Sequence, residues 1–146
     1  MWSWLILGLI LILDQGTKWL ITTSFHLGQS VLLLPPFVAL TLVHNTGAAF
    51  GLFKGLLLLL IVLSVVVVGW VGWEFIRHPA QPALIQWGCA LVGGGALGNL
   101  IDRLRCGYVI DFIDLRVWPV FNVADSAITI GVGLLLWHTC LHRQDG

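Results

Sequence analysis

The sequence predicts an all-α membrane protein with four transmembrane helices in a single domain, 1–146. Of its 146 residues, 58% are hydrophobic and only 10% are charged, too little charge for a soluble domain. Four separate apolar runs are each long enough to cross a bilayer, which takes about 20 helical residues. Eight tryptophans suit a protein with two membrane–water interfaces. The formal net charge of zero gives no electrostatic basis for binding a nucleic acid.

The four predicted spans end near charged or polar residues and cover 2–22, 55–76, 83–101 and 122–141. The first has no basic segment before it and no small-residue cleavage site, so we expect it to be retained rather than removed as a signal peptide. The second is uncharged until Glu74. Because four is an even number of spans, both termini are expected on one side of the membrane, with 23–54 and 102–121 on the other.

The two segments outside the membrane differ in character. Residues 37–44, FVALTLVH, partly alternate and are rich in β-forming side chains, so short strands are expected in the first segment. We expect the second segment, 102–121, to be a loop that carries most of the acidic residues. Lysine and arginine are slightly more numerous in these segments than beside the termini, which favours termini outside the cell. Counts this small leave the orientation open.

Four of the seven acidic residues lie close together in the sequence, at Asp102, Asp111, Asp114 and Asp125. Acidic groups are costly near lipid, so the cluster indicates a function. Asp102 is predicted to close the third span and Asp125 to lie in the first turn of the fourth, at the same membrane face. Two adjacent carboxylates share a proton, and such a pair hydrolyses an amide without a metal by activating water and hydrogen-bonding the carbonyl. Alternatively, these aspartates cap helices and pair with three nearby arginines.

Three other patterns have structural interpretations beside functional ones. Asp14, inside the first span, either contacts a substrate or ion or pairs with Lys18 at i+4. His138 and His142 have the i, i+4 spacing of metal ligands but no third ligand nearby, so we interpret them as interface residues. The glycines of GGGALGN at 93–99 favour close packing of helices in lipid.

Five short motifs follow one another along the chain: DQGTK at 14–18, HNTGAAFG at 44–51, GNLIDR at 98–103, VIDF at 109–112 and FNVADS at 121–126. Each alone is weak. Together, in this order and spread over nearly the whole chain, they resemble the lipoprotein signal peptidase (signal peptidase II) family.

The resemblance implies an intramembrane aspartic endopeptidase that removes the signal peptide from bacterial prolipoproteins, cutting before the diacylglyceryl-modified cysteine. It implies Asp111 and Asp125 as the catalytic pair, with no metal ion or other cofactor. Positions that line or support the site are implied at Asn45, Gly47, Asn99, Arg103 and Asn122. A stabilising role is implied for Asp14 and Asp102.

The resemblance also implies a location and partners. We expect a multi-pass protein of the bacterial inner membrane, with cytoplasmic termini and an active site near the outer face. A small extracytoplasmic β-sheet platform is expected from 23–54. The expected partners are the diacylglyceryl-modified prolipoprotein and membrane lipid, and the expected state is a monomer.

Two non-enzymatic alternatives have their own expectations. A proton- or ion-coupled carrier would use Asp14 and the acidic cluster, but the second and fourth spans lack charge in their middles. A structural scaffold would tolerate replacement of the aspartates by asparagine.

Overall fold

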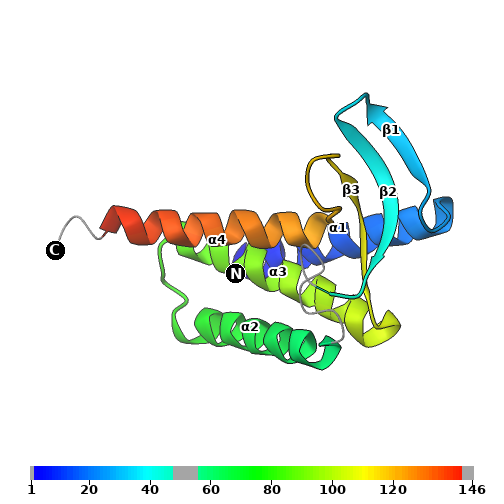
Figure 1. Cartoon of the computed structure of the whole chain (residues 1–146). Helices are drawn as coiled ribbons and strands as arrows, with labels where there is room; N and C mark the ends of the chain where they lie inside the picture. The colour runs from blue at the N-terminus through cyan, green and yellow to red at the C-terminus, as the bar shows by residue number, and fades with distance from the viewer. Residues whose placement is uncertain (1, 48–55, 143–146) are drawn as a thin grey trace.

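The computed structural model describes residues 2–47 and 56–142. Within these ranges the chain forms α1 (Trp2–Ser24), β1 (Ser30–Leu34), β2 (Val38–Asn45), α2 (Leu57–Arg77), α3 (Ala83–Cys106), β3 (Val109–Asp114) and α4 (Val123–His142) (Figure 1). All four helices are long and apolar enough to cross a membrane. Together with the small sheet, they confirm the predicted fold class. The last four residues of the HNTGAAFG motif, 48–51, lie outside the described residues, as does the predicted start of the second span at 55.

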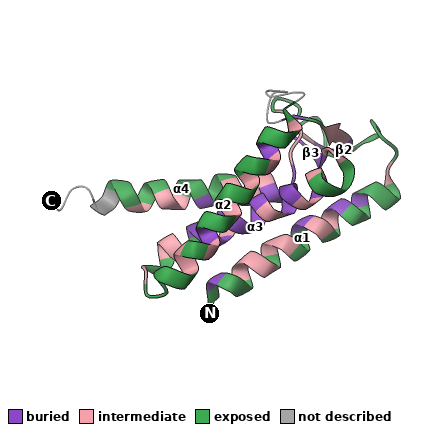
Figure 2. Cartoon of the chain, turned by 90° about the horizontal axis from the view of Figure 1, so that it is seen from below, coloured by how far each residue is buried: buried purple, intermediate pink, exposed green. Residues whose placement is uncertain are grey.

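Helix α3 is the centre of the helical part, and α1, α2 and α4 all pack against it. In the apolar stretch that would cross the membrane, 61% of the α3 residues are buried inside the protein. The corresponding share is 17% or less in each of the other three helices. Figure 2 shows the same contrast, with the buried residues concentrated along α3. The exposed leucines, valines and tryptophans of α1, α2 and α4 therefore suit contact with lipid, which covers apolar surface as water cannot.

Glycines allow the helices to approach α3 closely. A Cβ atom at Gly94 would lie 3.0 Å from Leu7 O of α1, and one at Gly98 would overlap the Asp14 carboxylate. A Cβ atom at Gly95 would overlap the backbone oxygen of Ala124 in α4. These contacts confirm the predicted role of the glycine-rich segment in helix packing.

The three strands form an antiparallel sheet in the order β1-β2-β3. The strands expected around 37–44 are confirmed by β2, but the expectation that 102–121 is entirely a loop was wrong. Residues 109–114 pair with β2, with Val109 opposite Asn45 and Asp111 opposite Val43. The sequence VIDFID is rich in β-branched residues and phenylalanine, which favours a strand, but its two aspartates obscure the apolar pattern.

The third helix also continues beyond the predicted end at residue 101. It ends at Cys106, and Gly107 takes the left-handed conformation (φ 79°) that commonly terminates a helix. Asp102 is therefore inside α3 rather than at its end, which corrects the prediction. The physical reason is that a charged residue marks where a helix leaves the lipid, not where its backbone hydrogen bonds stop.

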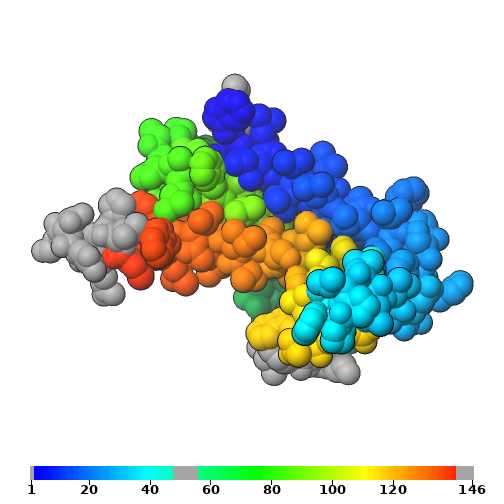
Figure 3. All heavy atoms as spheres, turned by 90° about the horizontal axis from the view of Figure 1, so that it is seen from above, coloured from blue at the N-terminus to red at the C-terminus, as the bar shows by residue number. Residues whose placement is uncertain are grey.

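The sheet lies near the end of α1 and the start of α4, away from the start of α1 and the end of α4 (Figures 1 and 2). Figure 3 shows the strands β1 and β2, in cyan, protruding beside the yellow segment that contains β3. Ile21 of α1, Leu42 of β2 and Phe112 of β3 form a buried apolar cluster. This cluster attaches the sheet to the end of α1 and so fixes the position of β3 relative to the helices.

Candidate active site

Two carboxylates from different elements, Asp111 on β3 and Asp125 on α4, meet at one asparagine. The Asn122 side chain donates from Nδ2 to Asp111 Oδ1 at 2.7 Å. The Asn122 backbone N–H donates to Asp125 Oδ2 at 3.3 Å. The structure therefore joins, through Asn122, the two aspartates that the resemblance implies as a pair.

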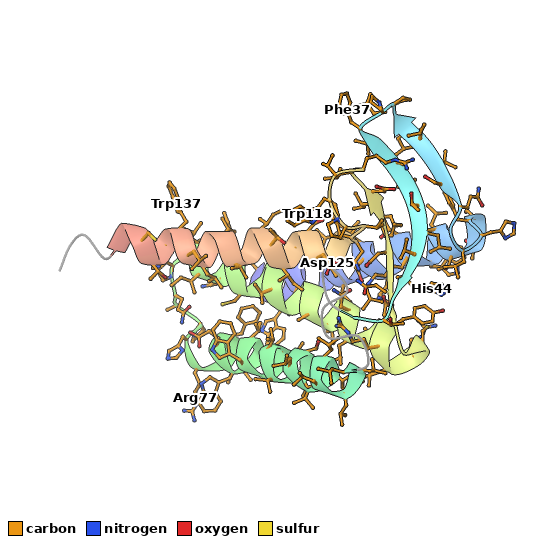
Figure 4. The ribbon with its side chains drawn as sticks, in the orientation of Figure 1. Phe37, His44, Arg77, Trp118, Asp125 and Trp137 are labelled. Carbon is orange, nitrogen blue, oxygen red and sulfur yellow. The ribbon has the colours of Figure 1, made fainter. Side chains whose placement is uncertain are left out.

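Asp125 is held in place by the start of α4. Asn122 immediately precedes the helix, and its Oδ1 accepts the Asp125 backbone N–H at 2.9 Å, while the Asp125 carboxylate accepts the Asn122 N–H in return. This reciprocal arrangement is a capping box, so the helix-capping alternative holds for Asp125. The capping box uses only one oxygen of the Asp125 carboxylate. The other, Oδ1, accepts a hydrogen bond from Asn99 Nδ2 at 2.8 Å. Figure 4 shows Asp125 at the end of α4 nearest the sheet.

Asp111 is almost fully buried, with 1% of its surface exposed. Burial, and to a smaller extent the charge of Asp125, raise the pKa of its carboxyl from 3.8 to about 7, against the opposing effects of hydrogen bonds from Asn45 and Asn122 and of the Lys18 charge. Near neutral pH, Asp111 is thus poised between its protonated and ionised forms. Two neighbouring carboxyls in this condition share one proton between them.

Asn45, at the end of β2, completes the surroundings of Asp111. Its Nδ2 donates to Asp111 Oδ2 at 2.8 Å, and its Oδ1 accepts the backbone N–H of Gly47 at 3.0 Å. The Gly47 N–H can only donate, so it determines which end of the amide faces Asp111. Beside Asn45, the rings of His44 and Tyr108 stack with their centroids 3.9 Å apart, which holds β2 against the turn that follows α3. The sequence pattern did not predict this stack.

A buried cluster of charges lies beneath the pair. Lys18 Nζ is 2.8 Å from Asp14 Oδ2, 2.8 Å from Asp102 Oδ2 and 3.0 Å from Asn99 Oδ1. The i, i+4 pairing predicted for Asp14 and Lys18 is confirmed, and Asp102 joins it from α3. Removing one partner of a buried ion pair costs about 3–5 kcal/mol, so this cluster is important for the fold of the site.

Gln15 is a site residue that the sequence reasoning missed. Its Nε2 is 3.0 Å from Asp102 Oδ1, 3.2 Å from Asp14 Oδ2 and 3.2 Å from the backbone oxygen of Gly98. It therefore links the two acidic members of the cluster and joins α1 to α3. One feature of the sequence could have identified it: Gln15 is a polar residue inside an apolar span, within the DQGTK motif.

A cavity of about 800 Å³ opens in front of Asp125, between α2, α3 and α4. Its polar end includes Asn45, Asn99 and Arg103. Its walls are largely apolar, with contributions from Leu60, Leu63, Val67, Val92, Ala96, Val109, Trp118, Phe121, Ile128 and Val132. Such a shape suits a ligand with long apolar parts and one polar group that reaches Asp125.

Asp114, the third carboxylate of the predicted cluster, has other partners. It accepts hydrogen bonds from Thr41 Oγ1 at 2.7 Å and from the Arg116 backbone at 2.8 Å, and Arg116 Nε lies 3.8 Å away. In the described part of the chain, this is the one aspartate–arginine pair within 4 Å. Pairing with arginine therefore explains Asp114 but neither Asp111 nor Asp125.

Metal ligands are not grouped in the described ranges 2–47 and 56–142, where no three His, Cys, Asp or Glu side chains are placed to hold an ion. The side chain of His142, half of the spaced histidine pair, lies outside what is described. The carboxylates at the site are instead surrounded by asparagine amides and backbone N–H groups.

Residues 6–141 match the family model for signal peptidase (SPase) II. The chain belongs to the signal peptidase II family. It is 45% identical over 137 residues to the lipoprotein signal peptidase of Pelotomaculum thermopropionicum, covering 94% of this chain and 90% of that protein. The lipoprotein signal peptidase of Moorella thermoacetica is 46% identical over 133 residues, covering 91% and 89% respectively.

A solved structure described as a bacterial membrane enzyme has the same fold as this signal peptidase II homologue. The TM-score is 0.92 at 34% identity, over 98% of this chain and 90% of the other. The resemblance carried by the five sequence motifs is thus confirmed, and the chain is a protease and a multi-pass membrane protein of a bacterial family. The carrier and scaffold alternatives are set aside on this ground.

Proposed function

We propose that this signal peptidase II homologue is an aspartic endopeptidase that cleaves prolipoproteins immediately before a diacylglyceryl-modified cysteine. Asp111 and Asp125 are its catalytic residues. The observation that carries the proposal is their convergence on Asn122, with Asp125 lining the polar end of a large apolar cavity. The relatives named lipoprotein signal peptidase support the substrate class.

The proposed chemistry needs one proton shared by the two carboxyls. The ionised carboxylate removes a proton from a water molecule, and the oxygen of that water attacks the scissile carbonyl carbon. The protonated carboxyl donates a hydrogen bond to the carbonyl oxygen, which stabilises the developing negative charge. The C–N bond then breaks, and the proton taken from water passes to the leaving amine. The raised pKa of Asp111 supports a carboxyl that retains a proton near neutral pH. The structure is compatible with either assignment of acid and base.

The cavity fits such a substrate. Its apolar walls on α2, α3 and α4 match a signal helix and two acyl chains, which then remain in the lipid layer during cleavage. The sheet end of the helices is proposed to face the outside of the inner membrane, with both termini in the cytoplasm. Arg103 and the asparagines Asn45 and Asn99 line the polar end, where they would bind the peptide backbone around the scissile bond.

The proposal is tested with the purified protein in detergent and a synthetic precursor that carries a diacylglyceryl cysteine. Mass spectrometry should show one cut, between the cysteine and the residue before it. The matched control is the same peptide with an unmodified cysteine, which should be cut far more slowly because it lacks the acyl chains. Equal cleavage of both peptides, or a cut elsewhere, would contradict the proposed substrate.

A further inference from the structure

The buried ammonium of Lys18 makes no hydrogen bond or ion pair within 4 Å with either carboxylate of the proposed catalytic pair, yet it reaches Asp125 through the Asn99 amide. We propose that Lys18 is a positioning residue for the peptidase reaction: it fixes the Asn99 side chain so that the Asn99 amide N–H points at Asp125. The inference rests on the proposed function and assigns to Lys18 a task beyond its pairing with Asp14.

The orientation of the Asn99 amide follows from its neighbours. An ammonium group has three donors and no acceptor, so the end of Asn99 that faces Lys18 at 3.0 Å must be the oxygen. The same oxygen accepts Asn122 Nδ2 at 3.1 Å. The NH₂ end then donates to Asp125 Oδ1 at 2.8 Å. Turning the amide over would place its NH₂ group against the ammonium and a lone pair against the carboxylate.

Lys18 is itself held from two sides. Asp14 Oδ2 and Asp102 Oδ2 each lie 2.8 Å from its nitrogen, and only 2% of the Lys18 side chain is exposed. Asp14 Oδ1 also accepts the backbone N–H of Ala124 at 2.9 Å, at the start of α4. Asp102 Oδ2 accepts the backbone N–H of Ile110 at 3.1 Å, next to Asp111. The ammonium is thereby fixed relative to both elements that carry the catalytic pair.

Lys18 does not line the cavity, whereas Asn99 does. Loss of Lys18 should therefore affect the chemical step more than substrate binding. Charged groups near this cluster come from every element around it: Asp14 on α1, Asp102 and Arg103 on α3, Asp111 on β3 and Asp125 on α4. The positive charge of Lys18 lowers the pKa of Asp111. The pH–rate profile should thus move to higher pH when Lys18 is replaced.

The test must separate positioning from general damage to a buried charge cluster. Lys18→Met alone leaves two buried carboxylates without a positive charge beside them, so it is combined with Asp14→Asn. The double variant keeps the net charge of the cluster and an oxygen for the Ala124 N–H. Asp14→Asn alone is the reference. Both are made again with Asn99→Ala, giving four variants for a double-mutant cycle.

Relative to Asp14→Asn, the Asp14→Asn/Lys18→Met variant should lose about 100-fold in kcat on the diacylglyceryl peptide, with KM little changed. Its pH–rate profile should shift upward. In the Asn99→Ala background, the added Lys18→Met change should have almost no effect on kcat. Equal losses in both backgrounds, or no loss in either, would overturn the inference.

A second variant keeps the inference testable if the double variant does not fold. Asn99→Asp retains an oxygen for Lys18 and nearly the same shape, but it has no N–H to offer Asp125. It should fold, by its melting temperature in detergent, and lose at least about 100-fold in kcat. Activity near that of the unmodified protein would overturn the inference.

Failure of the inference can be told apart from failure of the proposed function. If Asp111→Asn retained full activity, the proposed function itself would fail. If Asp111→Asn were inactive but the effects of the Lys18 and Asn99 substitutions were additive, only the role of Lys18 would be removed.

Discussion

The Asn122 side chain donates a 2.7 Å hydrogen bond to Asp111 across the space between α4 and β3. Because Asn122 also forms the capping box with Asp125, the residue that starts α4 is the one that joins the two carboxylates. Helix formation and assembly of the site therefore depend on the same side chain.

Replacing Asn122 should separate these two roles. Asn122→Ser keeps an oxygen for the Asp125 N–H but loses the donor to Asp111, whereas Asn122→Ala loses both. We expect both variants to lose about 100-fold in kcat. Only Asn122→Ala should also lose about 1 kcal/mol of stability through the missing cap. Melting in detergent and cleavage assays measure the two effects; wild-type activity of Asn122→Ser would refute the role of the Asp111 contact.

The raised pKa of Asp111 predicts a pH-dependent stability. A carboxyl that binds its proton more tightly in the folded state stabilises the fold fully below its unfolded pKa of 3.8 and loses that contribution as pH rises to about 7. The melting temperature of the unmodified protein should therefore fall, relative to that of Asp111→Asn, as pH rises through this interval. Above about pH 7 the difference should become constant. Parallel curves from pH 4 to 8 would show that the Asp111 pKa is not raised.

If the substrate occupies the cavity, a larger side chain in the cavity wall should weaken substrate binding. Val67 on α2 lines the cavity, while the adjacent Val66 is 61% exposed on the outer surface of the same helix. Val67→Trp should fill the cavity and raise KM by about tenfold or more, since a poorly fitting side chain costs 1–3 kcal/mol. Val66→Trp is the control and should leave KM unchanged. An equal effect of both substitutions would indicate that the substrate does not occupy this cavity.

Close helix packing predicts a difference between glycines. A Cβ atom at Gly95 would overlap the backbone oxygen of Ala124, whereas one at Gly69 in α2 meets nothing within 4 Å. Gly95→Ala should destabilise the protein by about 1–3 kcal/mol because the helices must move apart. Gly69→Ala should be neutral or slightly stabilising, since alanine favours a helix more than glycine does. Thermal unfolding in one detergent compares the two, and an unchanged melting temperature for Gly95→Ala would contradict the packing.

The helices were predictable because a bilayer demands long apolar runs, and those runs are visible without any tertiary information. Strand β3 was not, because Asp111 and Asp114 interrupt its apolar pattern and its pairing partner β2 is more than 60 residues away. The end of α3 was missed because Asp102 carries charge inside a helix, where its carboxylate accepts the Ile110 N–H and the Lys18 ammonium.

The acidic pair and the asparagines around it could be named from the motifs, but the contacts that join them could not. Asn45 reaches Asp111 across 66 positions, and Lys18 reaches Asn99 across 81. Such contacts are set by the packing of α1 on α3 and of β2 on β3, which no local pattern encodes. For this reason Gln15 was overlooked and Lys18 was assigned only to its neighbour Asp14.

The most direct test of the central claim is the cleavage rate of the diacylglyceryl peptide by Asp111→Asn and by Asp125→Asn, each purified in detergent and shown to be folded. Asparagine has the same shape as aspartate but cannot exchange the shared proton, so each variant should lose at least about 1,000-fold in kcat. Thr139→Ala, which removes a hydroxyl bonded within α4 far from the site, serves as the control. Retention of full activity by either folded aspartate variant would contradict the account.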